Sequence, residues 1–420
     1  MSTLIQIASS GSSSGRFGIA DSNGVYTYYS TLQAAITAAS AGQTVEFFTD
    51  YTETGNVSVN LKNDVNLNLN GHTYTLTNSG TANCIQDNGV GVNCIIANGI
   101  FKRIQGTPSL TNTLCLYITG ASDITCYDVK FIQDLGSGNK VSINVNNVNA
   151  RLTGAYCIGG NPTLRIDAGT VLDSNAIALN GSAISNYGVI KNCFGRGIGA
   201  GGIGNLGTAY NCVGIDDSTV GFGNGGTAIN CSGKGFQGYI SYTNSVNVNC
   251  TGTSSASTGY LANGAGYNFK CFGYSTAGYG IAMINSTLDT CVGFSSALAG
   301  IATSDSGANT SDVKNSQAIS TASIGFYANN ATTGCKIYNC TIESMWNNAA
   351  GHGIQGTANG LEIVNCTISV ANASANALFA SIARTFKYTQ NSFRGATTSV
   401  NANITQGMIN TDDAYGNITV

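Results

Sequence analysis

The stretch of sequence at residues 228–250, AINCSGKGFQGYISYTNSVNVNC, decides the fold because it begins and ends on the same pair, asparagine followed by cysteine. A polar residue followed by cysteine recurs between residues 190 and 294, and successive cysteines lie 19, 19, 19, 21 and 20 residues apart. The pairs are Asn192-Cys193, Asn211-Cys212, Asn230-Cys231, Asn249-Cys250, Lys270-Cys271 and Thr290-Cys291. Such self-similarity at a fixed period predicts a solenoid of stacked units.

A second mark keeps the same period: a glycine followed by an apolar or aromatic residue. Gly221-Phe222, Gly259-Tyr260, Gly280-Ile281 and Gly300-Ile301 each begin 9 residues after a cysteine of the repeat. A unit of about 20 residues is too short for helical repeats, which take about 33 or more. The regularly spaced leucines of leucine-rich repeats are missing. We therefore interpret each unit as one coil of a parallel β-helix.

The repeat also predicts which side chains face inward. In Val246-Asn247-Val248-Asn249-Cys250, strict alternation places the valines and the cysteine on the interior face and the asparagines outside. Glycine and asparagine suit the corners, where positive φ is least costly for them. The cysteines are expected to form a stacked ladder of buried, reduced thiols that act as small apolar groups. That ladder comprises Cys193, Cys212, Cys231, Cys250, Cys271, Cys291, Cys340 and Cys366.

From about residue 30 to residue 400 the chain resembles the right-handed parallel β-helix proteins of the pectin-lyase type, and most closely phage tailspikes and tail fibres. The words Thr31-Leu32-Gln33-Ala34-Ala35-Ile36 and Ala41-Gly42-Gln43-Thr44-Val45 resemble the N-terminal cap of that family. The resemblance implies an all-β fold, a single-stranded right-handed parallel β-helix with a short N-terminal capping helix. It implies no single activity, because this architecture hosts lyases, hydrolases, adhesins and tailspikes.

The order along the chain predicts four segments. A flexible leader for attachment covers residues 1–25, a capping helix and first strand cover 26–50, the β-helix covers 51–400, and a tail at 401–420 is a possible oligomer contact. Within the second segment, the helix is expected over 30–42, capped by Ser30 or Thr31. Roughly 16 rungs and a rod of about 75 Å follow from the strand spacing of about 4.8 Å.

Composition narrows the functions. Charged residues make up 9% of the chain and the net charge is −3, which predicts neither nucleic-acid binding nor an anionic-membrane partner. No long apolar run or basic, apolar signal segment is present, so we expect no membrane insertion and no export signal. The chain holds 2 histidines and no Cys-x2-Cys pair. We therefore predict no metal site and no cofactor.

Two words hint at catalysis. Asp216-Asp217 and Gly351-His352-Gly353 are similar to the words of polygalacturonase-type hydrolases, so Asp216, Asp217 and His352 are catalytic candidates. In that family the two words lie about one rung apart. Here some six rungs, or near 30 Å at about 4.8 Å each, separate them, which argues against a shared site. Arg165-Ile166-Asp167 is the other charged pair, and it is expected to be an ordinary surface ion pair.

Sugar binding makes fewer demands, since aromatic faces and neutral hydrogen-bonding groups suffice. The single tryptophan, Trp346, lies near Glu343 and His352, and these three are the glycan-binding candidates. The leading hypothesis is a virion tail protein that binds host-surface polysaccharide without catalysis. It would be a homo-oligomer, with a trimer guessed, and would contact other virion proteins through its N-terminal segment. The alternatives are a polysaccharide depolymerase on the same rod and a purely structural surface protein.

Overall fold

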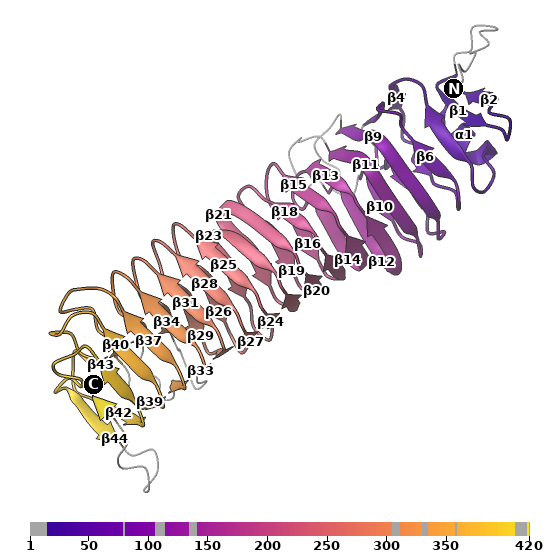
Figure 1. The fold of residues 1–420 in the computed structure, drawn as a ribbon. Helices are drawn as coiled ribbons and strands as arrows, with labels where there is room; N and C mark the ends of the chain where they lie inside the picture. Colours follow the sequence, from indigo (N-terminus) through magenta and orange to yellow (C-terminus); the bar gives the residue numbers. More distant parts are fainter. Residues whose placement is uncertain are drawn as a thin grey trace, which may run out of the picture.

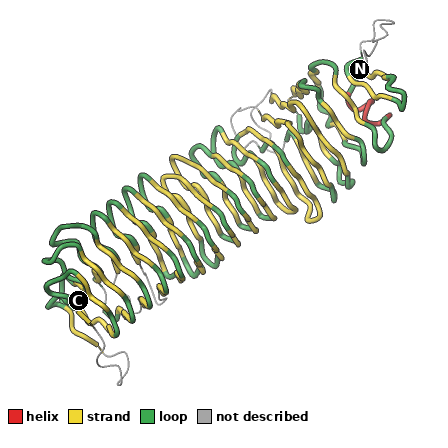
Figure 2. Tube along the Cα trace, in the orientation of Figure 1, coloured by secondary structure: helices red, strands yellow, loops and turns green. Residues whose placement is uncertain are grey.

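The computed structural model describes residues 15–78, 80–105, 114–133, 141–304, 311–329, 335–357, 359–407 and 418–419. These residues form a long rod in which the chain winds about one axis from the N-terminal to the C-terminal end (Figure 1). The rod has about 15 turns and is almost entirely β-strand and connecting turn (Figure 2). The prediction of a parallel β-helix is confirmed, and the predicted number of rungs is close to the observed one.

Each turn of the helix contributes a strand to each of three parallel sheets, which we name A, B and C in the order in which the chain visits them. The strands that lie in sheet A alone are β5 (Val59–Asn60), β8 (Ile85–Gln86), β10 (Leu116–Ile118), β16 (Ile184–Asn186), β19 (Ile203–Asn205), β26 (Tyr260–Asn263), β29 (Ile281–Ile284), β32 (Ile301–Ser304), β35 (Phe326–Asn329), β38 (Ile354–Gly356) and β41 (Leu378–Phe379).

Sheet B consists of β3 (Thr44–Phe47), β6 (Asn66–Asn68), β17 (Val189–Lys191), β20 (Thr208–Tyr210), β22 (Thr227–Ile229), β24 (Val246–Val248), β27 (Tyr267–Phe269), β30 (Thr287–Asp289), β33 (Asp312–Lys314), β36 (Lys336–Tyr338), β39 (Leu361–Val364), β42 (Arg384–Thr389) and β44 (Ile404–Gly407), together with parts of the longer strands named below.

Sheet C consists of β4 (Tyr51–Thr54), β7 (Thr73–Asn78), β13 (Tyr156–Gly159), β15 (Asn175–Ala178), β18 (Phe194–Arg196), β25 (Thr251–Ser254), β28 (Phe272–Ser275), β31 (Val292–Ser295), β34 (Gln317–Ser320), β37 (Thr341–Ser344), β40 (Thr367–Val370), β43 (Ser392–Arg394) and β45 (Ile418–Thr419). Six longer strands bend from one sheet into the next: β9 (Asn93–Gln105), β11 (Asp123–Gln133), β12 (Ile143–Thr153), β14 (Leu164–Leu172), β21 (Val213–Asn224) and β23 (Ser232–Ser241).

A single residue in the left-handed conformation turns the chain from sheet B into sheet C. Asn211, at φ 51°, does this in one rung, and Asn230, at φ 55°, does it in the next. The Asn230 amide Nδ2 donates to Asn211 Oδ1 at 3.0 Å, so the corner residues form a hydrogen-bonded ladder on the outside of the rod. Asparagine suits this corner because it tolerates positive φ better than most residues do.

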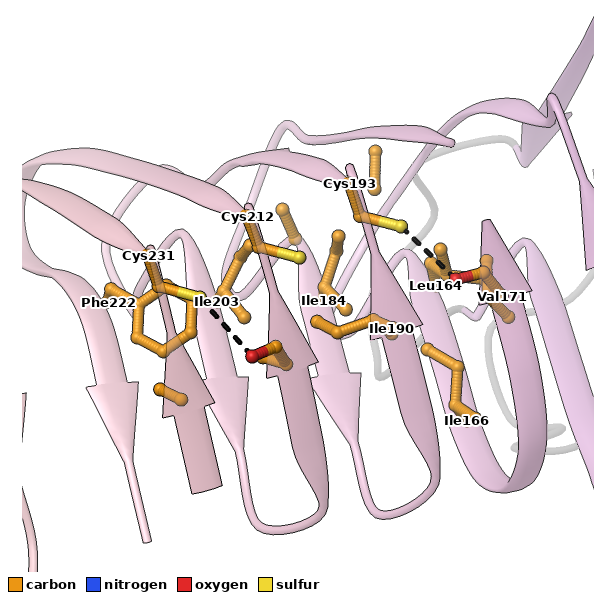
Figure 3. Close-up of a cluster of buried hydrophobic side chains, with 14 of the residues drawn as sticks. Leu164, Ile166, Val171, Ile184, Ile190, Cys193, Ile203, Cys212, Phe222 and Cys231 are labelled. Carbon is orange, nitrogen blue, oxygen red and sulfur yellow. Dashed lines mark hydrogen bonds between the residues drawn. The ribbon is translucent and has the colours of Figure 1, made fainter. Parts of the chain in front are cut away.

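The cysteines directly follow these corner residues and point into the rod. Cys193, Cys212 and Cys231 lie on successive rungs, each directly after a corner residue (Figure 3). The Cys193 thiol donates to Val171 O at 3.6 Å, and that of Cys231 donates to Ala209 O at 3.6 Å. The eight ladder cysteines are all buried and none is in a disulfide. On the rung between Cys291 and Cys340, Ser316 follows the corner residue in place of a cysteine.

The corner residue overturns the predicted facing of Val246–Cys250. Because Asn249 turns the chain, strict alternation stops there. Asn247 is fully buried, whereas Val246 is 40% exposed and Val248 is half-buried. Within the rod, Asn247 belongs to an interior ladder in which each side-chain amide donates to the next. The ladder consists of Asn186, Asn205, Asn224, Asn247 and Asn268.

Near the C-terminal end, Asn391 and not Ser392 occupies the cysteine position of its rung. Thr367 pairs with Ser392, and the Cys366 backbone N–H donates to Asn391 Oδ1 at 2.9 Å. Asn391 therefore follows Cys366 in the ladder, and Gln390, at φ 55°, takes the corner. Residues 374–386 form no helix; they hold β41 and the beginning of β42.

At the N-terminal end, β1 (Phe17–Ala20) and β2 (Tyr26–Tyr29) pair antiparallel, and β1 also pairs antiparallel with β3. This corrects the expected flexible leader at 1–25, of which residues 1–14 lie outside the described residues. The predicted helix is α1 (Leu32–Ala38), shorter than 30–42, and Thr31 caps it by accepting a hydrogen bond from Ala34 N at 3.2 Å. That α1 covers the N-terminal end of the rod stays a prediction.

Candidate functional site

The longest and most variable turns connect sheet C to sheet A, and we call the ridge that they form the C–A edge. It comprises residues 216–221, 235–238, 255–259, 276–280, 296–300, 321–325 and 345–353. Opposite this edge, across the rod, lies sheet B. Both words that suggested catalysis, and the tryptophan that suggested sugar binding, fall on this one edge.

A notch interrupts the edge because one turn is shorter than its neighbours. Asp216 pairs with Gly235, and Val220 pairs with Gln237. Between these two pairs the chain advances 4 residues in β21 but only 2 residues in β23. The sequence shows the same difference. Gly238 follows its cysteine by 7 residues, whereas Gly221 and Gly259 follow theirs by 9. The turn at 235–238 is therefore two residues shorter than the turns on the neighbouring rungs.

A cleft of about 420 Å³ lies at this notch. Its floor is the outer face of sheet C, where Lys234, Thr253 and Tyr274 lie in register on β23, β25 and β28. The cleft is lined by Asp217, Lys234, Gly235, Thr253, Ser254, Ser255, Tyr274 and Thr276. One aromatic ring, several hydroxyls, one cation and one carboxylate are the groups that recognise a polyhydroxylated ligand.

Asp216 builds the wall of this cleft and does not face it. Its buried carboxylate accepts from the backbone N–H groups of Gly201, Ser218 and Thr219, each at 2.9 Å. Burial acts to raise the pKa of Asp216, but the hydrogen bonds from the backbone outweigh it and the pKa is lowered. The carboxylate is ionised and fully engaged in holding two turns together, which leaves it unsuited to act on a bound sugar.

Asp217 is the carboxylate that reaches the cleft. Its side chain is 78% exposed, and its Oδ2 lies 3.9 Å from Nη2 of Arg196, a loose surface ion pair. Among the described residues that line the cleft, Asp217 is the only acid. Hydrolysis of a glycosidic bond usually takes two carboxyl groups at about 5–10 Å from each other. The cleft therefore contains the groups that bind a sugar, but its described residues supply one of the two carboxyl groups that hydrolysis usually takes.

His352 is not a surface residue. It is 7% exposed, its ring stacks on Phe379 with centroids 3.8 Å apart, and its Nδ1 accepts from Asn376 N at 3.1 Å. Burial lowers the pKa of His352 to about 4, so the ring is neutral at physiological pH. Six rungs of sheet C separate β21 from β37, and the structure does not bring His352 near the aspartates. The burial also removes it from the surface on which a glycan would bind.

Trp346 lies on the C–A edge, and Glu343 lies on the strand that leads into it. Glu343 is on the outer side of β37, and Trp346 is in the long turn that follows; both side chains are half-buried. Between this turn and the notch lies a second hollow of about 250 Å³ on the side of the edge that faces sheet A. It is lined by Tyr279, Leu298, Ala299, Ser323, Ile324, Tyr327 and Gln355. Aromatic and neutral polar groups thus follow the edge over several rungs.

The remaining charged candidates are structural. Arg165 Nε and Asp167 Oδ1 are 2.7 Å apart on the outer face of β14, which confirms the predicted surface ion pair. Within the described parts of the chain, no group of three or more histidine, cysteine or acidic side chains is placed to hold a metal ion. The described residues contain no helix long and apolar enough to cross a membrane.

Of the comparisons with known proteins, the one with solved structures finds matches, all of low sequence identity. No protein-family model and no curated protein matches the sequence. Among solved structures, a tailspike protein mutant of E. coli bacteriophage HK620 matches with a TM-score of 0.39 and 12% identity, over 92% of this chain and 74% of that one. The A-module of the mannuronan C-5 epimerase AlgE6 of Azotobacter vinelandii matches with a TM-score of 0.26 and 13% identity, over 93% and 94%.

Sequence reasoning missed most of the cleft. Lys234, Thr253 and Tyr274 lie on three different repeats, and none belongs to a recognisable motif. The sequence feature that could have located the cleft is Gly238, which follows its cysteine by 7 residues and not by 9. A shortened turn between longer ones leaves a gap on the surface.

Proposed function

We propose that this protein is a virion tail protein that binds host-surface polysaccharide along its C–A edge, without cleaving it. The observation that carries the proposal is the cleft at the notch, where Lys234, Thr253 and Tyr274 line a floor of three successive rungs. Strands about 4.8 Å apart present a repeating series of such groups, which suits a repeating polymer. The second hollow, Glu343 and the turn with Trp346 extend the contact along the edge.

The virion location and the homo-oligomer, with a trimer as the expected state, belong to the same proposal. They are supported by the β-helical architecture and by the length and low charge of the rod. The contact with other virion proteins through the N-terminal segment, and the oligomer contact of the tail at 401–420, are further parts of it. Mass spectrometry of purified particles would test the location, and the chain should be among the structural proteins.

A change of turn length tests the site without touching any of its side chains. Inserting Ser-Gly between Phe236 and Gln237 restores the length of the neighbouring turns, and we expect it to fill the notch and abolish binding of host polysaccharide in isothermal titration calorimetry. The same insertion between Ser381 and Ile382, in the exposed turn that leads from β41 to β42 away from the C–A edge, is the control and should leave binding within about twofold. Equal binding by both variants and the unmodified chain would overturn the assignment of the cleft.

A depolymerase would be distinguished from a binding protein by the reducing ends that it releases from polysaccharide. Polysaccharide incubated with the protein should release no reducing ends above background. Release that disappears in Asp217→Asn, but persists in a control such as Asp173→Asn, would show that the cleft hydrolyses its ligand. Polysaccharide binding without release supports the proposal as stated.

A further inference from the structure

The second hollow differs in chemistry from the cleft at the notch. The cleft is lined by one cation, Lys234, and one carboxylate, Asp217, whereas none of the residues that line the second hollow is charged. Three of the lining residues of the hollow, Leu298, Ala299 and Ile324, are aliphatic, and the others carry neutral hydrogen-bonding groups. The hollow is therefore suited to a part of the ligand that the cleft does not select.

The aliphatic residues come from two neighbouring turns of the C–A edge. Leu298 and Ala299 lie in the turn at 296–300, and Ile324 lies in the next turn along the edge. The strands that these two turns lead into, β32 and β35, pair in parallel. Leu298 is 40% exposed, so its side chain presents apolar surface to a ligand. Apolar surface that leaves water on binding stabilises a complex, which favours a ligand with an apolar group at this position.

The neutral polar groups of the hollow are available for hydrogen bonds to a ligand. Tyr327 on β35 and Gln355 on β38 pair in register, while Ser323 and Tyr279 lie in turns of the C–A edge. Within the described parts of the chain, the side-chain oxygen and nitrogen atoms of these four residues make no hydrogen bond. Burial, and to a smaller extent the nearby Tyr327 hydroxyl, raise the pKa of Tyr279, so its phenol stays protonated and able to donate.

The size of the hollow limits what it can hold. Its volume of about 250 Å³ lies below the range of about 300–1,000 Å³ that is typical of pockets for a whole small ligand. A single sugar unit, or one substituent of it, is the part of a polysaccharide that fits. The turn at 276–280 joins the two sites, since Thr276 lines the cleft and Tyr279 lines the hollow. A polymer that crosses this turn contacts both.

We infer that the second hollow binds the acetyl group of an acetylated sugar unit in the polysaccharide. The methyl group contacts the three aliphatic side chains, and the carbonyl oxygen accepts a hydrogen bond from the Gln355 amide or from a tyrosine hydroxyl. A sugar with hydroxyl groups alone would place them against aliphatic surface, where a polar group that loses water without a new partner is destabilising. A charged substituent finds no opposite charge among the lining residues. The inference rests on the polysaccharide binding of the proposed function and names the class of sugar that the edge selects.

Saturation-transfer difference NMR with small probes tests the hollow independently of the host polysaccharide. The probes are N-acetylglucosamine and an O-acetylated glucose, which present the acetyl group through an amide and through an ester. With the unmodified protein, the acetyl methyl protons of at least one probe should receive more saturation than its ring protons, and the stronger probe identifies the linkage. Absence of transfer to the methyl protons of both probes would overturn the inference.

Variants of the hollow locate the contact. Ser323→Phe places a ring in the hollow and should abolish the methyl signal, and Gln355→Leu keeps the size of the side chain but removes its amide and should lower the signal severalfold. Ser381→Phe, in the exposed turn between β41 and β42, is the matched control and should keep the full signal. All three variants should keep the far-ultraviolet circular dichroism spectrum of the unmodified chain. A methyl signal that persists unchanged in both hollow variants would contradict the inference.

Isothermal titration calorimetry carries the test to the host polysaccharide. Chemical removal of its acetyl groups should weaken binding to the unmodified protein by about fourfold or more, the effect expected from withdrawing one buried methyl group. Ser323→Phe should bind the two forms of the polymer equally. Equal affinity of the unmodified protein for both forms would overturn the inference, as would tight binding of a polymer without acetyl groups. Binding of the acetylated probes without binding of any host polysaccharide would count against the proposed function and not against the hollow.

Discussion

The side-chain amide of Asn224 donates to Oδ1 of Asn247 at 2.8 Å, and both residues are completely buried inside the rod. Asn247 also accepts from the Tyr239 hydroxyl at 2.6 Å and donates to Asn268 Oδ1 at 3.0 Å. A narrow interior therefore contains a continuous line of amides that satisfy one another. Satisfied buried polar groups stabilise and specify the register of the rungs, whereas unsatisfied ones are costly.

Asn247→Leu should lower the free energy of unfolding by about 3–5 kcal/mol, since it leaves several buried donors and acceptors without partners. Urea denaturation followed by circular dichroism measures this loss. Val248→Leu, on the same strand but facing outward, is the control and should stay within about 0.5 kcal/mol. If the two variants were equally stable, the interior amide ladder would not contribute to register or stability.

At the outer asparagine corners, substitutions can separate the contributions of the backbone conformation and of the side chain to the free energy of unfolding. Asn211, at φ 51°, donates to Asn192 Oδ1 at 3.1 Å and accepts from Asn230 at 3.0 Å. Asn211→Ala should cost about 1–3 kcal/mol, because a left-handed alanine costs about 1–2 kcal/mol and two exposed hydrogen bonds are lost. Asn211→Gly removes the strain and should recover part of the loss. Equal losses in the two variants would show that conformation at the corner is not what asparagine provides.

Stability should fall on acidification through His352. Its pKa is lowered to about 4 by burial, below the ordinary value of 6.5, so the unfolded chain binds a proton in this range while the folded chain does not. The contribution of the neutral ring is fully present above pH 6.5 and is lost as the pH falls from 6.5 towards 4; a shift of this size corresponds to about 3 kcal/mol.

Urea midpoints at pH 7.5 and pH 5 measure that effect. The difference between the two pH values should shrink in His352→Phe, which keeps the stacking on Phe379 but cannot bind a proton. An unaltered pH dependence in His352→Phe would contradict the buried, neutral state of the ring.

Individual side chains of the cleft should contribute unequally to polysaccharide binding. Tyr274→Ala removes the ring on which a sugar can stack, and we expect affinity to fall by about 10-fold or more, in line with about 1–2 kcal/mol for an aromatic contact. Lys234→Gln should weaken an acidic polysaccharide more than a neutral one. Tyr156→Ala, on the same sheet outside the cleft, is the control for calorimetry; a loss equal to that of Tyr274→Ala would place the contact elsewhere.

The parts of the structure that could be predicted are those that repeat. Pairs such as Asn211-Cys212 recur on successive rungs because the corner demands one residue at positive φ followed by one small buried side chain. What escaped prediction depends on single rungs. Asn247 faces inward because the corner at Asn249 ends the alternation. Lys234 and Tyr274 line one cleft because sheet C places residues from separate repeats in register. The ring of Phe379, from a later rung, covers His352, and no local sequence pattern predicts this contact.

Hydroxyl-radical footprinting with and without host polysaccharide shows whether the polymer lies along the C–A edge. We expect binding to protect Tyr274, Tyr279, Tyr327 and Trp346, and to leave the exposed residues Tyr187 and Tyr267, at sheet B, unchanged. Protection confined to Tyr187 and Tyr267, or bound polysaccharide that protects none of the first four residues, would show that the polymer lies elsewhere.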